Sequence, residues 1–242
     1  MEKKYKFVIS LGWFCGVAQE TERIGLRCKS YPFDWILTDL ETVEEMIQTG
    51  FEDFLNQDKL FQDQNVKNMY HQTGRECLTY VHDINPYCDF GKEVEKARGK
   101  YKRRIQHFME DICEPCLFIR YICDQLEYDR IQNGETQILD ILRRYNQNSD
   151  IIFIRNSDIN ADENQEKIKT FVVEKDEGDS VARKWLEKNQ ILRELLNGNQ
   201  YDFDRKENLR IYKHKRFKQK LLKYPNKCKR FIWKLLFLYK KG

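Results

Sequence analysis

Residues 7–36 read FVISLGWFCGVAQETERIGLRCKSYPFDWI, and this stretch decides the fold. Its start, Phe7-Val8-Ile9, is apolar and β-branched, which predicts a strand. The strand pattern breaks at Gly12, and a helix-compatible segment over residues 15–26 follows, closed by Gly25 as a left-handed stop. The order of strand, turn and helix therefore places Cys15 at a helix N-terminus.

A helix N-terminus favours a negative charge, because its first amides are free and its end is partly positive. A thiol held there is expected to ionise more easily than a free thiol. Cys15 is therefore a candidate nucleophile. The alternative is that Cys15 is a small buried apolar side chain, as unpaired cysteines often are.

Apolar strand patterns alternate with helical patterns along the rest of the chain. We predict strands at residues 5–11, 77–81, 116–122, 151–154 and 171–173. Helices are expected at residues 39–48, capped by Thr38 or Asp39, and at 92–112, 136–145 and 179–196. Residues 30–36 are expected to be extended because Pro32 disfavours a helical Tyr31, and residues 51–71 show no regular pattern.

Strands that are apolar on both faces and alternate with helices indicate an α/β fold with an open, mostly parallel sheet and helices on both faces. In such sheets the functional site lies beyond the carboxyl ends of the strands. The turn at 12–15, His82 with Asp83, Arg120 and Arg155 would all lie at that edge. The sequence therefore predicts that these residues meet.

The net charge of +4 conceals a division along the chain. Residues 205–242 hold 15 Lys or Arg and one acidic residue, while the other 204 residues hold 28 basic and 38 acidic residues. We therefore expect one α/β domain over residues 1–204 and a basic amphipathic helical tail over residues 205–242. The tail suits the anionic surface of a membrane, although it could instead pack its apolar stripe on the domain. Nucleic acid is an unfavourable partner because the acidic body would repel it.

No run of 18 apolar residues occurs, so a cytoplasmic protein is expected, peripheral at the inner face of the membrane if the tail binds lipid. The eight cysteines fit that compartment as free thiols. Neither G-x-x-x-x-G-K-[ST] nor G-x-G-x-x-G is present, so no nucleotide cofactor is expected. The pair Cys113 and Cys116 lacks the two further ligands that zinc requires, so no metal is expected either.

Several motifs together resemble a known family. These are ISLGWFC, GLRCKSYPFDW, VHD at residues 81–83, a helix containing KRRI, and an apolar strand that ends in arginine. The combination resembles the bacterial papain-like cysteine peptidases, a domain family otherwise of unknown function, over about residues 5–160. The resemblance implies a Cys-His hydrolase with Cys15 and His82 at the matching positions, and an association with surface-polysaccharide functions. A papain-like fold would place its cysteine on a long helix against an antiparallel sheet, whereas strands and helices alternate here.

A Cys-His pair requires the imidazole within hydrogen-bond reach of the sulfur and a third group that orients the ring. Asp83 is adjacent to His82, but neighbours on a strand point to opposite faces. Asp34 is then the better candidate orienter, with Asn85 or Asp89 behind it. The amides at residues 14–16 would form the oxyanion hole. Otherwise, His82 is a strand-end histidine bonded to a carbonyl.

Substrate contacts are expected from Arg27, Ser30, Trp35 and Arg120. An arginine at a strand end can hold a carboxylate or phosphate, and an aromatic ring can stack on a sugar. The alternatives are ion pairs for the arginines and a core position for Trp35. The chain is thus expected to be a cysteine hydrolase or acyltransferase acting on an acyl, peptide or glycan substrate. The alternative is a non-catalytic glycan- or anion-binding module in polysaccharide assembly.

Overall fold

A four-stranded parallel sheet forms one half of the body in the computed structural model, which describes residues 4–13, 15–161, 166–173, 202 and 204–222. Its strands lie in the order β1-β6-β7-β8, and every neighbouring pair is parallel. Their bounds are β1 Phe7–Ser10, β6 Cys116–Tyr121, β7 Asp150–Asn156 and β8 Thr170–Val173. The predicted α/β class and parallel sheet are confirmed.

Both faces of this sheet are covered, which explains why its strands are apolar throughout. Phe118 and Phe153 point into one core cluster, while Ile119 and Ile154 point into another. This alternation follows from the two-residue repeat of a strand. The first cluster also holds buried residues of α2, α3, α4 and α5, and the second holds Val17 of α1.

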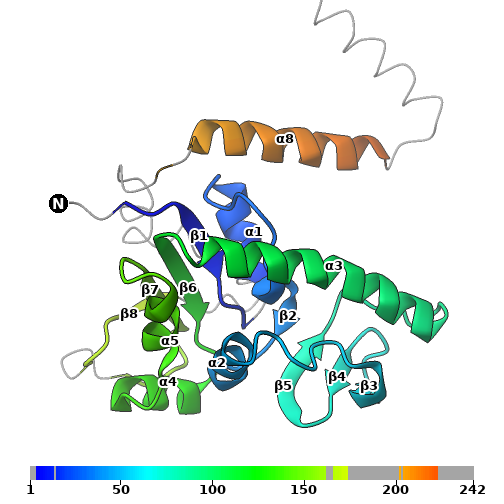
Figure 1. The fold of residues 1–242 in the computed structure, drawn as a ribbon, viewed down its shortest axis with the longest axis horizontal. Helices are drawn as coiled ribbons and strands as arrows, with labels where there is room; N and C mark the ends of the chain where they lie inside the picture. The colour runs from blue at the N-terminus through cyan, green and yellow to red at the C-terminus, as the bar shows by residue number, and fades with distance from the viewer. Residues whose placement is uncertain (1–3, 14, 162–165, 174–201, 203, 223–242) are drawn as a thin grey trace, which may run out of the picture.

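A second, antiparallel sheet lies beside the first, and its strand order is β2-β5-β4-β3 (Figure 1). The bounds are β2 Ile36–Leu37, β3 Leu60–Gln62, β4 Tyr70–Gln72 and β5 Arg75–Tyr80. The strand predicted at residues 77–81 is present as β5, but it pairs with β2 and β4 and not with the parallel sheet. His82 and Asp83 therefore do not follow a strand of the parallel sheet, and the expected edge shared with Arg120 and Arg155 is wrong.

Six α-helices lie among the described residues. They are α1 Cys15–Arg23, α2 Leu40–Gln48, α3 Phe90–Asp111, α4 Gln125–Asn133, α5 Ile138–Tyr145 and α8 Arg205–Leu222. The Asp39 carboxylate caps α2 by accepting the Thr42 amide at 2.8 Å, as predicted. The helix α4 was not predicted, and residues 136–145 correspond to α5. The helix expected at 179–196 and the tail beyond residue 222 lie outside the described residues.

The PFDW motif is a 3₁₀ helix, η1 Pro32–Trp35, and not an extended segment. Tyr31 is extended, at φ −117° and ψ 165°, as the following proline requires. Proline suits the first position of a helix, and the Asp34 carboxylate accepts the Tyr31 amide at 2.8 Å. Those two features close a helical turn that the sequence prediction missed. A second short 3₁₀ helix, η2 Gln57–Lys59, lies within the stretch of 51–71 that showed no regular pattern.

No helix in the described parts of the chain is long and apolar enough to cross a lipid bilayer.

Candidate functional site

Cys15 is the first residue of α1, as predicted, and is half-buried. The turn that leads to it packs on the segment 33–38. Gly12 adopts the left-handed φ of 81°, and a Cβ placed there would lie 3.2 Å from Thr38 Cγ2 and 3.5 Å from the Phe33 carbonyl oxygen. Glycine is therefore required at this close approach. The polar neighbour of the thiol is Gln19, one helical turn on, whose Nε2 donates to Sγ at 3.4 Å.

Burial raises the pKa of the Cys15 thiol above its ordinary value of 9.0, and a backbone hydrogen bond at the helix start lowers it only in part. The expectation that this thiol ionises more easily than a free one is therefore wrong for this arrangement. Removing water from around the sulfur destabilises the thiolate more than the hydrogen bond at the helix start stabilises it. The resting nucleophile would be the neutral thiol.

His82 lies two residues beyond the end of β5 and is exposed. Its ring meets the indole of Trp35 edge to face, with ring centroids 6.2 Å apart and an interplanar angle of 84°. No hydrogen bond joins His82 to Cys15, Asp34 or Asp83 within the residues that the structure describes. The imidazole of His82 is therefore positioned by its aromatic contact with Trp35.

Arg27, Ser30, Asp34 and Trp35 form one cluster between α1 and η1. Arg27 Nη2 donates to Asp34 Oδ2 at 2.6 Å and to Ser30 Oγ at 2.8 Å. The guanidinium carbon of Arg27 lies 5.8 Å from the centroid of the Trp35 ring, a cation–π arrangement. Four sequence candidates thus meet here, and His82 joins them through Trp35.

The Asp34 carboxyl is fully buried, so its pKa is raised despite the neighbouring Arg27 cation and the Tyr31 amide. Its Oδ1 and the Nε of Arg27 have no hydrogen-bond partner among the described residues. The pair is thus tied together within the body and makes no hydrogen bond to the imidazole.

Asp83 is bound to α3 instead of His82. Its Oδ1 accepts Lys100 Nζ and its Oδ2 accepts the Tyr101 hydroxyl, both at 2.5 Å. These contacts anchor the segment after β5 to α3, so the acid adjacent to His82 fixes the position of the backbone.

Arg120 is fully buried, and its guanidinium is largely occupied. Nε and Nη2 donate to the two oxygens of Glu127 at 2.7 and 2.5 Å. Nη1 donates to the Leu11 carbonyl and Nη2 to the Thr38 carbonyl, each at 2.9 Å. This geometry favours the ion-pair alternative over substrate binding. Arg120 thereby joins the turn before Cys15 to the segment after Trp35.

Two residues of this region were not anticipated, namely Gln19 beside the thiol and Glu127 under Arg120. A signal for Glu127 was present in the sequence, because Asp124 followed three residues later by a glutamate matches an acidic helix start. Asp124 does cap α4, accepting the Glu127 amide at 2.9 Å. Gln19 carries no comparable signal.

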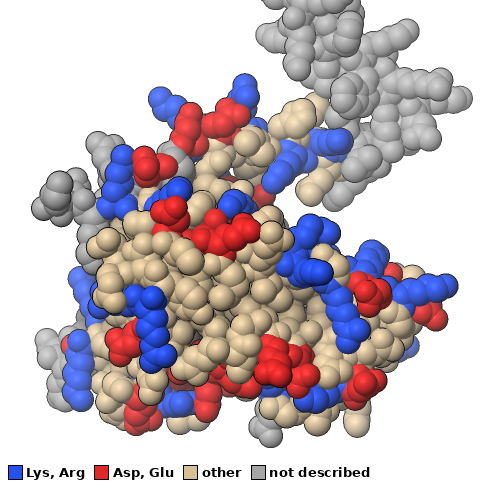
Figure 2. Space-filling view, in the orientation of Figure 1, with Lys and Arg blue, Asp and Glu red and all other residues tan. Residues whose placement is uncertain are grey.

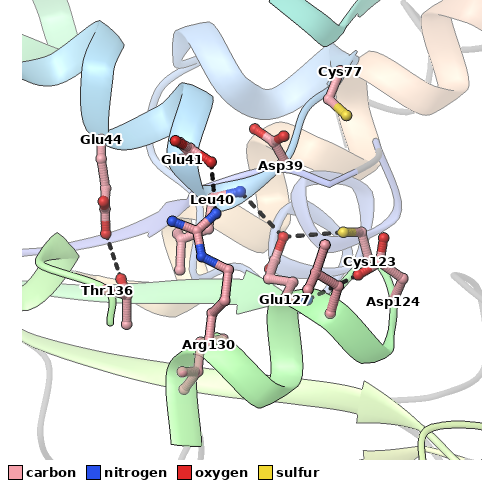
Figure 3. Close-up of a pocket in the computed structure, with 12 residues that line it drawn as sticks. Asp39, Leu40, Glu41, Glu44, Cys77, Cys123, Asp124, Glu127, Arg130 and Thr136 are labelled. Atoms are coloured by element: carbon pink, nitrogen blue, oxygen red, sulfur yellow. Dashed lines mark hydrogen bonds and ion pairs between the residues drawn. The ribbon is translucent and has the colours of Figure 1, made fainter. Parts of the chain in front are cut away.

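A hollow of about 160 Å³ lies beyond the carboxyl end of β6, and Cys15 is not among the residues that line it (Figure 3). The polar side chains that line it form hydrogen bonds and an ion pair between α2 and the stretch of chain that contains α4 and Thr136. Glu127 accepts the Leu40 amide at 3.1 Å, Glu41 pairs with Arg130 at 2.6 Å, and Glu44 accepts a hydrogen bond from Thr136. The hollow is thus lined by bonded side chains that hold two helices together.

The seven described cysteines are free thiols. Cys113 and Cys116 donate to the carbonyls of Met109 and Asp111 near the end of α3. Within the described ranges, no three His, Cys, Asp or Glu side chains are arranged to hold a metal ion.

The fold and site define an α/β protein with a cysteine at a strand-to-helix turn, and comparison with known proteins gives the family. The family model described as "Putative papain-like cysteine peptidase (DUF1796)" matches residues 6–175, and the chain belongs to this family. Among curated proteins, "Uncharacterized protein R408" of Acanthamoeba polyphaga mimivirus is 40% identical over 47 residues. That match covers 19% of this chain and 21% of the viral protein, so the chain spans about a fifth of its relative. No solved structure shows significant similarity.

Proposed function

We propose that this protein is a cysteine hydrolase in which Cys15 attacks an acyl carbon and His82 serves as general base and then general acid. One observation carries the proposal. The turn that presents Cys15 packs on the segment 33–38, and Trp35 of that same segment contacts the imidazole of His82. The two groups are thus attached to one structural element, and membership of a cysteine peptidase family supports the assignment.

The raised pKa of Cys15 determines how the first step would proceed. A neutral thiol must lose its proton as it attacks, so the imidazole accepts that proton while the Sγ–acyl bond forms. His82 then donates the proton to the leaving group, leaving a thioester on Cys15. Water attacks the thioester and gives a proton to His82. The bond between the acyl carbon and Sγ then breaks, the acid is released, and His82 returns the proton to the Cys15 sulfur. The proposal requires the exposed His82 ring to come within hydrogen-bond reach of the sulfur when substrate binds, and catalytic hydrogen bonds are often long without substrate.

The acceptor of the acyl group sets the reaction class. Water gives a peptidase or another hydrolase, and a hydroxyl group gives an acyltransferase through the same thioester. A glycan hydroxyl as acceptor would connect the protein with surface-polysaccharide assembly. That connection rests on the family resemblance alone.

The experiment is mass-spectrometric labelling of the full chain with a peptidyl epoxide, whose ring is opened by an activated thiol that lies beside the bound peptide. We expect Cys15 to be labelled ahead of Cys77, which is exposed, and His82→Gln to slow that labelling. Cys77→Ala is the matched control and should leave labelling of Cys15 unchanged. Equal labelling of Cys15 and Cys77, unaffected by His82→Gln, would refute the proposal.

A non-catalytic glycan- or anion-binding module is the second candidate. It is favoured by the absence of a hydrogen bond between Cys15 and His82 in the described residues. In this case, Cys15→Ala would leave binding of a glycan or anionic ligand unchanged, measured by calorimetry. Loss of an acyl-transfer activity in the same variant would decide for the hydrolase.

A further inference from the structure

One face of α8 packs on the body, where it contacts α1 and the residues that follow it (Figure 1). Arg205 Nε donates to the Ile24 carbonyl at 2.7 Å, and Asn208 Nδ2 donates to the Gly25 carbonyl at 3.2 Å. Leu209 lies so close that a Cβ on Gly25 would be 2.7 Å from its Cγ. These residues recur at the three- and four-residue spacing of one helix face.

A neighbouring face of α8, about a third of a turn from the first, is exposed and basic. Lys206, Arg210, Lys213 and Phe217 follow one another at four, three and four residues, and all are exposed. The Phe217 side chain is 42% exposed, which places an aromatic ring in solvent among cations. Lys206 and Lys213 make no ion pair within the described part of the chain. In Figure 2, blue Lys and Arg side chains lie along this helix, together with red acidic side chains toward its left end.

The composition of α8 strengthens the charge of this face. Its 18 residues include eight Lys or Arg and one acidic residue, Glu207, which pairs with Arg210 at 2.9 Å. Ile211 is a second exposed apolar side chain of α8, at 44%, but it lies on another side of the helix from Phe217. A helix with cations and exposed apolar groups that is too short and polar to span a bilayer is typical of interfacial helices.

We propose that the face of α8 formed by Lys206, Arg210, Lys213 and Phe217 docks on an anionic lipid bilayer, with the helix lying in the plane of the interface. The cations attract the anionic headgroups, and Phe217 enters the boundary between headgroups and acyl chains. A polyanion such as nucleic acid would use the cations but would offer no apolar layer for Phe217. The face packed on α1 stays attached, so the body approaches the membrane together with α8.

The experiment is co-sedimentation of the full chain with vesicles of phosphatidylcholine alone or mixed with phosphatidylserine. The test variant carries Lys206→Glu and Lys213→Glu. The matched control carries Lys102→Glu and Arg103→Glu, which change the same net charge on exposed residues of α3. Phe217→Ala tests the apolar contribution, and circular dichroism checks that each variant remains folded.

We expect binding only to vesicles that contain phosphatidylserine. The α8 double variant should lose at least about fivefold in partitioning for each charge, and the α3 control should lose much less. Phe217→Ala should weaken binding also at high salt, where the cations are screened. Equal losses in the two double variants, unchanged binding in the α8 variant, or binding to single-stranded RNA without vesicle binding would each overturn the proposal. None of these readouts depends on the reactivity of Cys15, so failure here is distinct from failure of the proposed hydrolase.

Discussion

The indole of Trp35 and the imidazole of His82 meet edge to face, 6.2 Å between ring centroids, although 47 positions separate them in the sequence. Such contacts favour particular ring orientations. Trp35 in turn lies under the Arg27 guanidinium, which is fixed by the buried Asp34 carboxylate. The structure therefore connects the exposed histidine to a rigid pair inside the body.

Replacing Trp35 by leucine should release the His82 ring. We expect the His82 ring resonances in two-dimensional NMR to shift, because the ring current of the indole is lost, while those of His71 stay in place. The chain has four histidines, so the resonances are readily assigned. If the proposed hydrolase activity is present, it should fall roughly ten- to a hundredfold through misplacement of the base.

Trp35→Phe retains an aromatic ring and is the control for this change. It should keep much of the His82 shift and of the activity. Identical His82 resonances in wild type and Trp35→Leu would show that the contact does not hold the imidazole.

The pH dependence of alkylation at Cys15 follows from its raised pKa. Only the thiolate reacts, so the rate with iodoacetamide should rise with pH and reach its midpoint above 9.0 in the folded protein. In the unfolded chain the midpoint should return to the ordinary value, so the same residue serves as its own reference. Because the folded state binds this proton more tightly, the contribution of Cys15 to stability is complete below the ordinary pKa and declines as pH rises past it. A folded midpoint below that of the unfolded chain would mean that the helix terminus outweighs burial.

The sequence was sufficient for the local architecture around Cys15. An apolar run, Gly12 and Gly25 are signals within 20 residues, and each fixes one boundary of β1 or α1. The sheet to which β5 belongs was beyond such signals, because periodicity reveals a strand but not its partner. The strand β3 was missed since two of its three residues, Phe61 and Gln62, are exposed and show no apolar alternation.

In the candidate site, too, a contact within one motif could be predicted from the sequence, whereas a contact between distant segments could not. Arg27 and Asp34 are seven residues apart in one recognisable motif, so their proximity was within reach of the sequence. The partners of Arg120 were missed for two reasons. Glu127 lies only seven residues along the chain, but it belongs to α4, which was not recognised, and the Thr38 carbonyl lies 82 positions away. Contacts of that range are set by packing of whole elements, which no local pattern encodes.

Arg120 should be required for stability. Arg120→Gln leaves the buried Glu127 carboxylate without its cation, which should cost about 3–5 kcal/mol in the free energy of unfolding. Arg130→Gln is the matched control, since it removes a cation from an exposed pair with Glu41 and should cost about 0–1 kcal/mol. Urea denaturation of both variants measures the difference. Equally small losses of unfolding free energy in the two variants would show that the buried Glu127 carboxylate does not depend on Arg120.

Gly25→Ala should detach α8 from the end of α1. The added Cβ would lie 2.7 Å from Leu209 Cγ and 2.8 Å from the Arg205 carbonyl oxygen, so the helix must move away. Hydrogen exchange of the amides in α8 should accelerate, because the helix loses the packing that stabilises it. Gly134→Ala is the control, since Gly134 shares the left-handed conformation, with φ 76° against 79°, but has no atom within 4 Å of an added Cβ. Both variants carry the backbone strain of a left-handed alanine, so only the steric conflict distinguishes them. Faster exchange in α8 for Gly25→Ala alone would establish that this contact holds the helix, and equal exchange in the two variants would exclude it.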